Sequence, residues 1–331
     1  MYQKFYKMTG KPFQLSADPR FFYGSTVHKR AMSYLRYGLM QGEGFIVITG
    51  SVGAGKTMLA RTLVSELADN STVVAQVVTT QLEANDMLRI VAASYGLAQE
   101  GVTKATLLKA IESFLISKAR EGKRVLLLVD EAQNLPPDSL EELRMLSNFQ
   151  VRERALLQCF LLGQDEFRQT LALENMEQLR QRIIVAYHLN PLGKDETRGY
   201  IEHRLKLVGW DSDPMITDKA YEAIYGYTEG LPRRINTFCD RVLLCTYVEE
   251  SHVVDQQTIN AVIKEMNSED FYSGRATKVA VKSDQLFEER LARLEETVAI
   301  LEEAVDRLAR NIQPGSASTA ELYRLSTYSK D

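Results

Sequence analysis

Eight residues between an apolar run and an amphipathic stretch carry the most specific chemical pattern of this sequence. GSVGAGKT, which begins at Gly50 and ends at Thr57, fits the spacing GxxxxGK[ST]. GFIVITG at 44–50 reads as a buried strand, and helical spacing follows the loop. Glycines let backbone N–H groups turn toward phosphate oxygens, and a helix N-terminus adds its positive dipole end. The pattern predicts an ATP-binding loop made of Gly50, Ser51, Val52, Gly53, Ala54, Gly55, Lys56, Thr57 and Met58.

A second apolar run ends in two carboxylates and completes the predicted site. RVLLLVDEA at 124–132 reads as a buried strand that closes with Asp130 and Glu131. Lys56 is expected to reach the β- and γ-phosphates of ATP, while Thr57 and Asp130 hold Mg²⁺. Glu131 is then placed to polarise the attacking water. We therefore expect an ATPase and not a protein that only binds ATP.

Composition limits the class of protein but does not select a function. The chain has 331 residues, a net charge of −4 and a pI of about 5.8, so it has no global basic surface for nucleic acid. Three separated cysteines (Cys159, Cys239 and Cys245) favour buried thiols in a reducing cytoplasm, and the four histidines show no metal-ligand spacing. The N-terminus does not resemble a secretory signal, and no apolar run reaches the length of a membrane span. We expect a cytoplasmic protein that can dock at a membrane through partners.

Apolar periodicity predicts an α/β core at 25–190 with strands alternating with helices. Such alternation is typical of a parallel sheet with helices on both faces. After Pro191 only helical spacing remains, which predicts a small all-α lid domain at 191–267. We expect strands at 44–50, 72–78, 124–132, 156–163 and 185–189, core helices at 28–41, 56–67, 82–96, 104–120, 139–148 and 178–184, and lid helices at 194–208, 217–228, 232–248 and 255–267.

The two ends of the chain have patterns of their own. Residues 1–24 are rich in aromatics and proline and are expected to form an irregular strap. After a linker at 268–284, apolar residues recur in steps of three and four across 285–312, which predicts a coiled coil. β-Branched residues at a and leucine at d favour a parallel dimer, and the alternative is an amphipathic helix packed on its own domain. Residues 313–331 are expected to be a flexible tail.

The order of these motifs resembles the AAA+ ATPases, a P-loop NTPase class. Within them the sequence is similar to the ExeA/GspA-type secretion ATPases, and most of all to the ATPase of exosortase (XrtA, PEP-CTERM) loci. The resemblance covers nearly all of residues 1–266. The matching stretches are KPFQLSADPRFFYGSTVHKRA, YLRYGLMQGEGFIVITGSVGAGKT, LLLVDEAQNLPPDSLEELRMLSNFQ, FLLGQDEF, LRQRI and GLPRRINTFCDR.

The resemblance implies roles for three further residues. Gln164 matches sensor 1, a polar side chain that detects the γ-phosphate. Arg182 matches the arginine finger that enters a neighbouring subunit's site, and Arg180 is the alternative. Arg233 matches sensor 2, which reports the nucleotide state from the lid, and Arg234 is its alternative. For each arginine, a surface salt bridge is the structural alternative.

The strap also resembles a segment of the family, one that runs past the nucleotide base. Its marker residues are Pro12, Phe13, Pro19 and Phe21, and core packing is the simpler explanation for them. His28 follows in the same stretch and is a candidate for contact with the adenine or ribose.

An arginine finger requires a neighbour, so the resemblance implies a ring oligomer, hexameric as AAA+ cores usually are, with coiled-coil contacts. ExeA/GspA-type proteins carry a transmembrane helix and a periplasmic peptidoglycan-binding part after the ATPase. The linker and coiled coil in their place favour the exosortase-locus type, which implies an envelope secretion or exopolysaccharide system and a protein partner there. Two alternatives remain: a nucleic-acid-binding regulator of the TnsC transposition type, and a scaffold whose assembly ATP gates.

Overall fold

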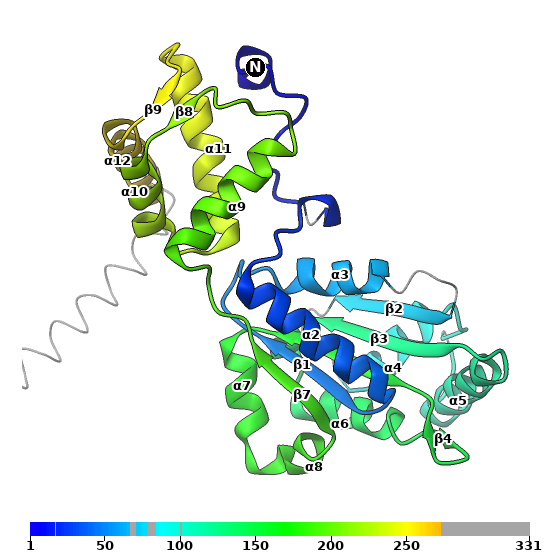
Figure 1. Cartoon of the computed structure of the whole chain (residues 1–331). Coiled ribbons are helices and arrows are strands. Elements are labelled where there is room, and N and C mark those ends of the chain that lie inside the picture. Colours follow the sequence, from blue (N-terminus) through cyan, green and yellow to red (C-terminus); the bar gives the residue numbers. More distant parts are fainter. Residues whose placement is uncertain (17, 67–70, 79–83, 100, 273–331) are drawn as a thin grey trace, which may run out of the picture. The chain divides into compact units, whose positions relative to one another are not determined.

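A computed structural model describes residues 1–272 except 17, 67–70, 79–83 and 100 (Figure 1). The chain divides into two compact units, Met1–Ile263 and Lys264–Asp331. The predicted coiled coil and tail lie outside the described residues. Helix α12 (Gln256–Tyr272) extends into the segment predicted to be a linker, so 268–272 are helical. Among the described residues, no helix is long and apolar enough to cross a bilayer.

Five parallel strands form the central sheet of the first unit, as the sequence predicts. Their order across the sheet is β2-β3-β6-β1-β7, so the strand before the phosphate loop lies between β6 and β7. The apolar run TVVAQVV at 72–78 predicts a buried strand, but β2 lies at the edge of the sheet, and Gln76 and Val78 near its end are exposed. The strands are β1 (Phe45–Thr49), β2 (Thr72–Val78), β3 (Arg124–Asp130), β6 (Gln158–Gly163) and β7 (Ile183–His188).

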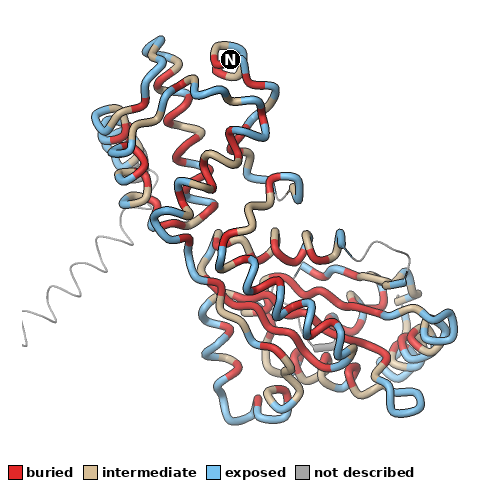
Figure 2. The backbone as a smooth tube through the Cα atoms, viewed as in Figure 1, coloured by how far each residue is buried: buried red, intermediate tan, exposed pale blue. Residues whose placement is uncertain are grey.

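Helices cover both faces of this sheet, because successive side chains of the central strands point to opposite faces. In β1, Ile46 and Ile48 pack under α2 (Thr26–Gln41) and α3 (Lys56–Glu66). Phe45 and Val47 pack on the opposite face. The buried strands between the two layers appear red in Figure 2. The second layer consists of α4 (Ala84–Ser94), α5 (Lys104–Arg120), α6 (Pro137–Leu146), α7 (Asp165–Ala172) and α8 (Glu177–Arg180).

Several short elements differ from the sequence prediction. Helix α7 is an addition, and the predicted helix at 178–184 is only the short α8, because β7 begins already at Ile183. Two-residue strands β4 (Gln150–Val151) and β5 (Arg154–Ala155) form an antiparallel hairpin. The described part of the unit also contains three 3₁₀ turns: η1 (Pro19–Phe21), η2 (Ala132–Asn134) and η3 (Glu174–Met176).

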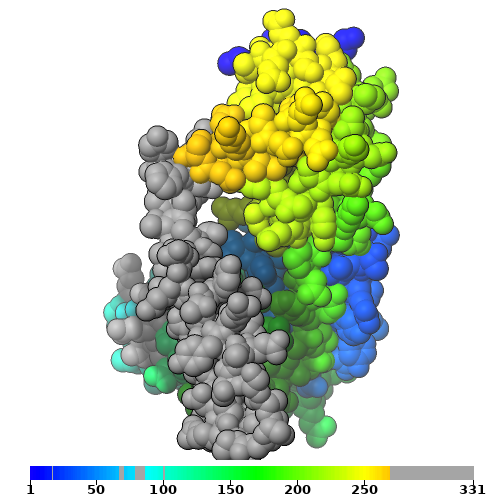
Figure 3. Space-filling model, turned by 90° about the vertical axis from the view of Figure 1, so that its left-hand side faces the viewer, coloured from blue at the N-terminus to red at the C-terminus, as the bar shows by residue number. Residues whose placement is uncertain are grey.

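Four helices follow the sheet, and their packed atoms run from yellow-green to orange in Figure 3. Phe238 and Ile259 are fully buried among these helices, and Cys239 is buried there as well. Strands β8 (Met215–Ile216) and β9 (Val253–Val254) pair in parallel beside them. The helices are α9 (Lys194–Lys206), α10 (Asp218–Thr228), α11 (Pro232–Val248) and the first part of α12.

The N-terminal strap is more regular than its composition predicts. It opens with helix α1 (Tyr2–Phe5), which packs on α11. The Tyr2 hydroxyl donates to Asp240 Oδ1 at 2.6 Å, and burial together with this carboxylate raises the pKa of Tyr2. The backbone N–H of Thr9 donates to the Val208 carbonyl at 2.8 Å. These contacts fix the beginning of the strap to the helices that follow the sheet.

Candidate active site

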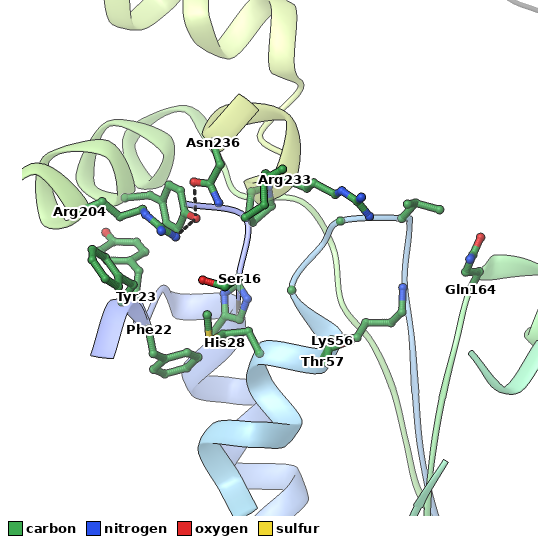
Figure 4. A pocket seen from close by; sticks show the side chains of 18 of the residues that line it. Ser16, Phe22, Tyr23, His28, Lys56, Thr57, Gln164, Arg204, Arg233 and Asn236 are labelled. Atoms are coloured by element: carbon green, nitrogen blue, oxygen red, sulfur yellow. Dashed lines mark hydrogen bonds between the residues drawn. The ribbon is translucent and has the colours of Figure 1, made fainter. Parts of the chain in front are cut away.

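The glycine-rich loop connects β1 to α3 at the carboxyl end of the sheet, and Figure 4 shows its surroundings. Gly53 has a φ of 80°, and a Cβ there would lie 2.5 Å from the Cβ of Arg233. Only glycine fits, for reasons of both conformation and space. The Arg233 N–H in turn donates to the Gly53 carbonyl at 3.2 Å, so α11 begins directly against the loop. A larger residue at this position would separate the two segments.

Lys56 closes the loop on itself. Its Nζ donates to the carbonyl oxygens of Gly50 at 2.6 Å and Ser51 at 3.1 Å. The side chain is buried, and burial lowers the pKa of Lys56, although the Glu131 and Asp130 carboxylates oppose this shift. The ammonium group is therefore held inside the loop at the place where phosphate oxygens would be recognised.

Thr57 and Asp130 meet as the sequence predicts. The Thr57 hydroxyl donates to Asp130 Oδ2 at 2.9 Å, and the Glu131 backbone N–H donates to Asp130 Oδ1 at 3.0 Å. Asp130 is only 6% exposed. A hydroxyl and a carboxylate supply the oxygen ligands that Mg²⁺ prefers. The donor set thus fits the predicted metal site.

Glu131 occupies a strained backbone position next to this pair. Its φ of 56° and ψ of 42° are left-handed, which is uncommon for residues other than glycine and recurs at functional sites. Its Oε2 accepts hydrogen bonds from the amides of Gln133 at 2.6 Å and Gln164 at 2.9 Å. Burial alone would raise the pKa of Glu131, but these two amides and the charges of Lys56 and Arg233 lower it. The carboxylate is therefore ionised and fixed in orientation.

Lys56, Thr57, Glu131 and Gln164 line one cavity of about 290 Å³. Its phosphate-loop side carries Lys56 and Thr57, with Glu131 and Gln164 nearby, and its other side is made of the strap and the helices α9 and α11. The second side is aromatic and amphipathic, which suits a flat heteroaromatic ring. Its lining residues are Leu15, Ser16, Phe21, Phe22, Tyr23, Tyr200, Arg204, Pro232, Arg233 and Asn236.

The structure separates the two candidates for sensor 2. Arg233 lines the cavity, and its charge acts on Glu131. Arg234 instead pairs with Glu229 at 2.7 Å and donates to the Tyr227 carbonyl at 2.6 Å. Only the first of the two arginines is thus positioned to respond to a ligand in the cavity.

The two candidates for the arginine finger also differ. Arg180 Nη1 donates to the carbonyls of Leu171 and Leu173, both at 2.6 Å, which places this guanidinium in a structural role. Arg182 makes a 3.5 Å contact from Nη1 to the Ser147 hydroxyl. Arg182 precedes β7, at the opposite end of the strands from the phosphate loop, so it does not join its own chain's cavity. Contact with a nucleotide would have to occur in another subunit.

His28 lies behind the phosphate loop. Its ring Nδ1 is 2.8 Å from the Ser25 hydroxyl, and a Cβ at Gly55 would lie 3.0 Å from its Nε2. Burial lowers the pKa of His28, which keeps the ring neutral. The ring lines the cavity and supports the loop from below (Figure 4).

A buried arginine that the sequence prediction missed joins the strap to α9. Arg204 is 2% exposed, and its guanidinium donates to the carbonyls of Pro12 at 2.7 Å and Gln14 at 3.2 Å and to the Tyr200 hydroxyl at 2.9 Å. It also lies 4.7 Å above the Phe21 ring. Tyr200 continues the network to Asn236 Oδ1 at 2.9 Å, drawn dashed in Figure 4. The strap residues thus contribute to packing and to the cavity wall.

Replacing Arg204 with methionine should lower the free energy of unfolding by about 3 kcal/mol, because the buried Pro12 carbonyl and the partly buried Gln14 carbonyl lose their donor. Chemical denaturation followed by circular dichroism measures this. Arg198 is the matched control on the same helix: it is half exposed and pairs with Glu202 and Asp218, so Arg198→Met should cost less than about 1 kcal/mol. Equal losses in the two variants would contradict a structural role for the Arg204 network.

Sequence comparison identifies the domain. Residues 39–171 match the family model described as AAA domain. Over 268 residues, 81% of this chain, the sequence is 36% identical to General secretion pathway protein A of Aeromonas hydrophila. The chain covers 49% of that relative, about half its length. The AAA domain and the similarity to a GspA-type protein are thereby confirmed.

Solved structures show the same fold. The ORC2 protein of Aeropyrum pernix, solved as ADPNP–ADP complexes, aligns with a TM-score of 0.61 at 17% identity, covering 77% of this chain and 71% of that one. The RuvB Holliday junction branch migration motor of Thermotoga maritima aligns with a TM-score of 0.51 at 21% identity, covering 72% and 68%. At these identities the likeness shows the fold, an α/β P-loop ATPase fold, and nothing beyond it.

Proposed function

For a chain with an AAA domain and a GspA-type relative, we propose the function of a Mg²⁺-dependent ATPase that works as an oligomer. One observation carries the proposal: an ionised Glu131, fixed by two amides, shares a cavity with Lys56 and Thr57, whose hydroxyl meets Asp130. A site that only bound ATP would not need an oriented carboxylate next to the predicted metal ligands.

Each residue has a separate task in this proposal. Lys56 and the loop N–H groups hold the triphosphate. Thr57 and Asp130 would hold Mg²⁺, which when bound neutralises charge on the phosphates. Glu131 orients a water and accepts its proton, and the amide of Gln164 turns to the γ-phosphate as sensor 1.

The arginines support the oligomeric part of the proposal. Arg182, whose side chain has a single long hydrogen bond among the residues that the structure describes, is proposed as the finger that enters the next subunit's site in a ring, hexameric by analogy with AAA+ cores. Arg233 is proposed as sensor 2. The helices of 191–267 then act as a lid on the core at 25–190, with the strap at 1–24, and the sequence pattern at 285–312 adds coiled-coil contacts.

The cellular role rests on the relative. A 36% identity to a general secretion pathway protein supports work in bacterial envelope secretion, and the residue patterns favour the exosortase-locus type associated with exopolysaccharide production. We place the protein in the cytoplasm, associated with the inner membrane through a protein partner. Because the chain covers half of that relative, the whole relative's activity does not transfer directly.

Steady-state ATP turnover together with light-scattering mass tests the proposal. The wild-type protein should hydrolyse ATP only with Mg²⁺, and turnover per chain should rise with protein concentration as the mass increases. Turnover that is independent of assembly would contradict the oligomeric site. Stimulation by DNA would favour the regulator alternative, and nucleotide-dependent assembly with negligible turnover would favour the scaffold.

Lys56→Ala should weaken ATP binding by about two orders of magnitude, because hydrogen bonds to charged groups contribute about 1.5–3 kcal/mol each. Equilibrium binding of a fluorescent ATP analogue measures this. Lys104→Ala is the matched control, since that lysine pairs with Glu142 on the surface and should leave binding unchanged. Normal affinity in the Lys56 variant would show that the loop does not bind the triphosphate.

A further inference from the structure

Gln133 makes two hydrogen bonds in opposite directions, one from each end of its side-chain amide. Its Nε2 donates to Glu131 Oε2 at 2.6 Å, and its Oε1 accepts from the Gln164 backbone N–H at 3.0 Å. The Gln164 side chain donates to the same Glu131 oxygen at 2.9 Å. The three residues therefore form a closed triangle of hydrogen bonds between the end of β3 and the start of α7.

The backbone at all three residues of the triangle is restricted by its surroundings. Gln133 lies in the 3₁₀ turn η2, which packs against α7 and β6. Gln164 is the N-cap of α7 and directly follows Gly163, where a Cβ would lie 2.6 Å from the Phe167 side chain. Glu131 has the left-handed backbone described above, a conformation that persists where surrounding contacts enforce it. The Gln133 side chain, which is hydrogen-bonded at both ends of its amide, is therefore a suitable fixed support for the Glu131 carboxylate.

We propose that Gln133 is a positioning residue for hydrolysis, which keeps the Glu131 carboxylate aimed at the attacking water while the amide of Gln164 turns to the phosphate. The inference rests on the proposed function, because it assigns Gln133 to the same hydrolytic step. Of the residues that the structure describes, those lining the cavity include Glu131 and Gln164 but not Gln133. In this proposal Gln133 acts through Glu131 and does not touch the ligand.

The division of roles follows from geometry. The Gln164 amide is within the cavity, so a bound phosphate competes with Glu131 for it. The Gln133 amide has no such competitor, because its carbonyl end is held by a backbone N–H that stays in place when the Gln164 side chain rotates. The hydrogen bond from Gln164 to Glu131 can thus be exchanged for one to phosphate, while the hydrogen bond from Gln133 is permanent. Loss of the permanent one leaves the carboxylate without its support at the moment when hydrolysis begins.

Gln133→Met tests this, because methionine has a similar length and no amide. The turnover number kcat should fall by about 10- to 100-fold, since small misplacements of a catalytic group have effects of this size. The KM for ATP should stay within about twofold, because Gln133 does not touch the ligand. Gln133→Asn, which keeps the amide but is one methylene shorter, should fall between the wild type and the methionine variant.

A double variant separates positioning from a structural effect. In the Glu131→Gln background, adding Gln133→Met should cause no further loss of the residual turnover, because the amide would have lost the carboxylate through which it acts. Gln158→Met is the matched control: Gln158 is a buried glutamine that donates to the Gly38 and Glu43 carbonyls at 2.8 and 2.9 Å. That variant should lose stability and keep its kcat below the melting temperature.

The outcomes distinguish the two proposals. Wild-type kcat in Gln133→Met, a loss carried by KM, or an additive loss in the double variant would each overturn the positioning role. If Glu131→Gln hydrolyses ATP at the wild-type rate, the proposed function fails first. If Glu131→Gln is inactive and Gln133→Met is normal, only the inference about Gln133 fails.

Discussion

Glu131→Gln should keep Mg-ATP bound and slow its hydrolysis by about 10²- to 10⁴-fold, the usual contribution of a general base. The amide is nearly the same size as the carboxylate but cannot accept a proton from water. In the structure Glu131 is ionised and held by the amides of Gln133 and Gln164, so the substitution removes the base and leaves the cavity walls in place. Single-turnover hydrolysis and equilibrium binding of ATP measure the two effects separately.

Glu141→Gln is the control for the loss of one carboxylate. Glu141 pairs with Arg144 on α6, and its side chain is 45% exposed. Its turnover should match the wild type. A Glu131→Gln protein that hydrolyses ATP at the same rate as this control would show that another group activates the water.

Arg182→Ala should bind ATP as well as the wild type and lose about 10³-fold of its oligomer-dependent turnover, because arginine fingers in related phosphoryl-transfer systems contribute about 10³–10⁵. The residue lies at the far end of the strands from its own phosphate loop, so its chemistry requires a neighbour. Turnover measured across a range of protein concentrations, alongside light-scattering mass, shows whether assembly survives while activity is lost.

A mixing experiment tests whether the arginine acts between subunits. Combining Arg182→Ala with Glu131→Gln protein should restore part of the turnover, because some interfaces then join an intact Glu131 to an intact Arg182. Arg180→Ala serves as the comparison: its guanidinium caps the Leu171 and Leu173 carbonyls, so its main effect should be lower stability. If mixing restores no turnover, Arg182 is not the arginine finger.

The residues proposed to bind phosphate and metal were predictable because the chemistry of such a site fixes their spacing. The loop Gly50–Thr57 requires glycines, a lysine and a hydroxyl in a fixed order after a strand, and Asp130 must end another strand of the same sheet. The Thr57–Asp130 hydrogen bond joins residues 73 positions apart, and the parallel sheet alone determines that they meet. The sheet itself was predictable because its central strands are continuous apolar runs.

Side-chain partners inside the site were not predictable in the same way. Gln133 stands within the quoted DEAQ stretch, but no spacing rule says that its amide spans Glu131 and the Gln164 backbone. Arg204 sits in a helix rich in charges, where an arginine reads as a surface residue, and only the tertiary fold brings the carbonyls of the strap to it. Helix α7 was missed because its eight residues are mostly polar and only Phe167 and Leu171 are buried.

The Arg204 network has a mechanical consequence. The strap is fastened to α9 through the Pro12 and Gln14 carbonyls, while α11 is fastened to the phosphate loop through the Arg233–Gly53 hydrogen bond. A rotation of α9 and α11 against the sheet would therefore move the strap with them and displace the phosphate loop at the same time. The two walls of the cavity should then move together, so a ligand that fills the cavity would restrain the strap, the helices and the phosphate loop at once.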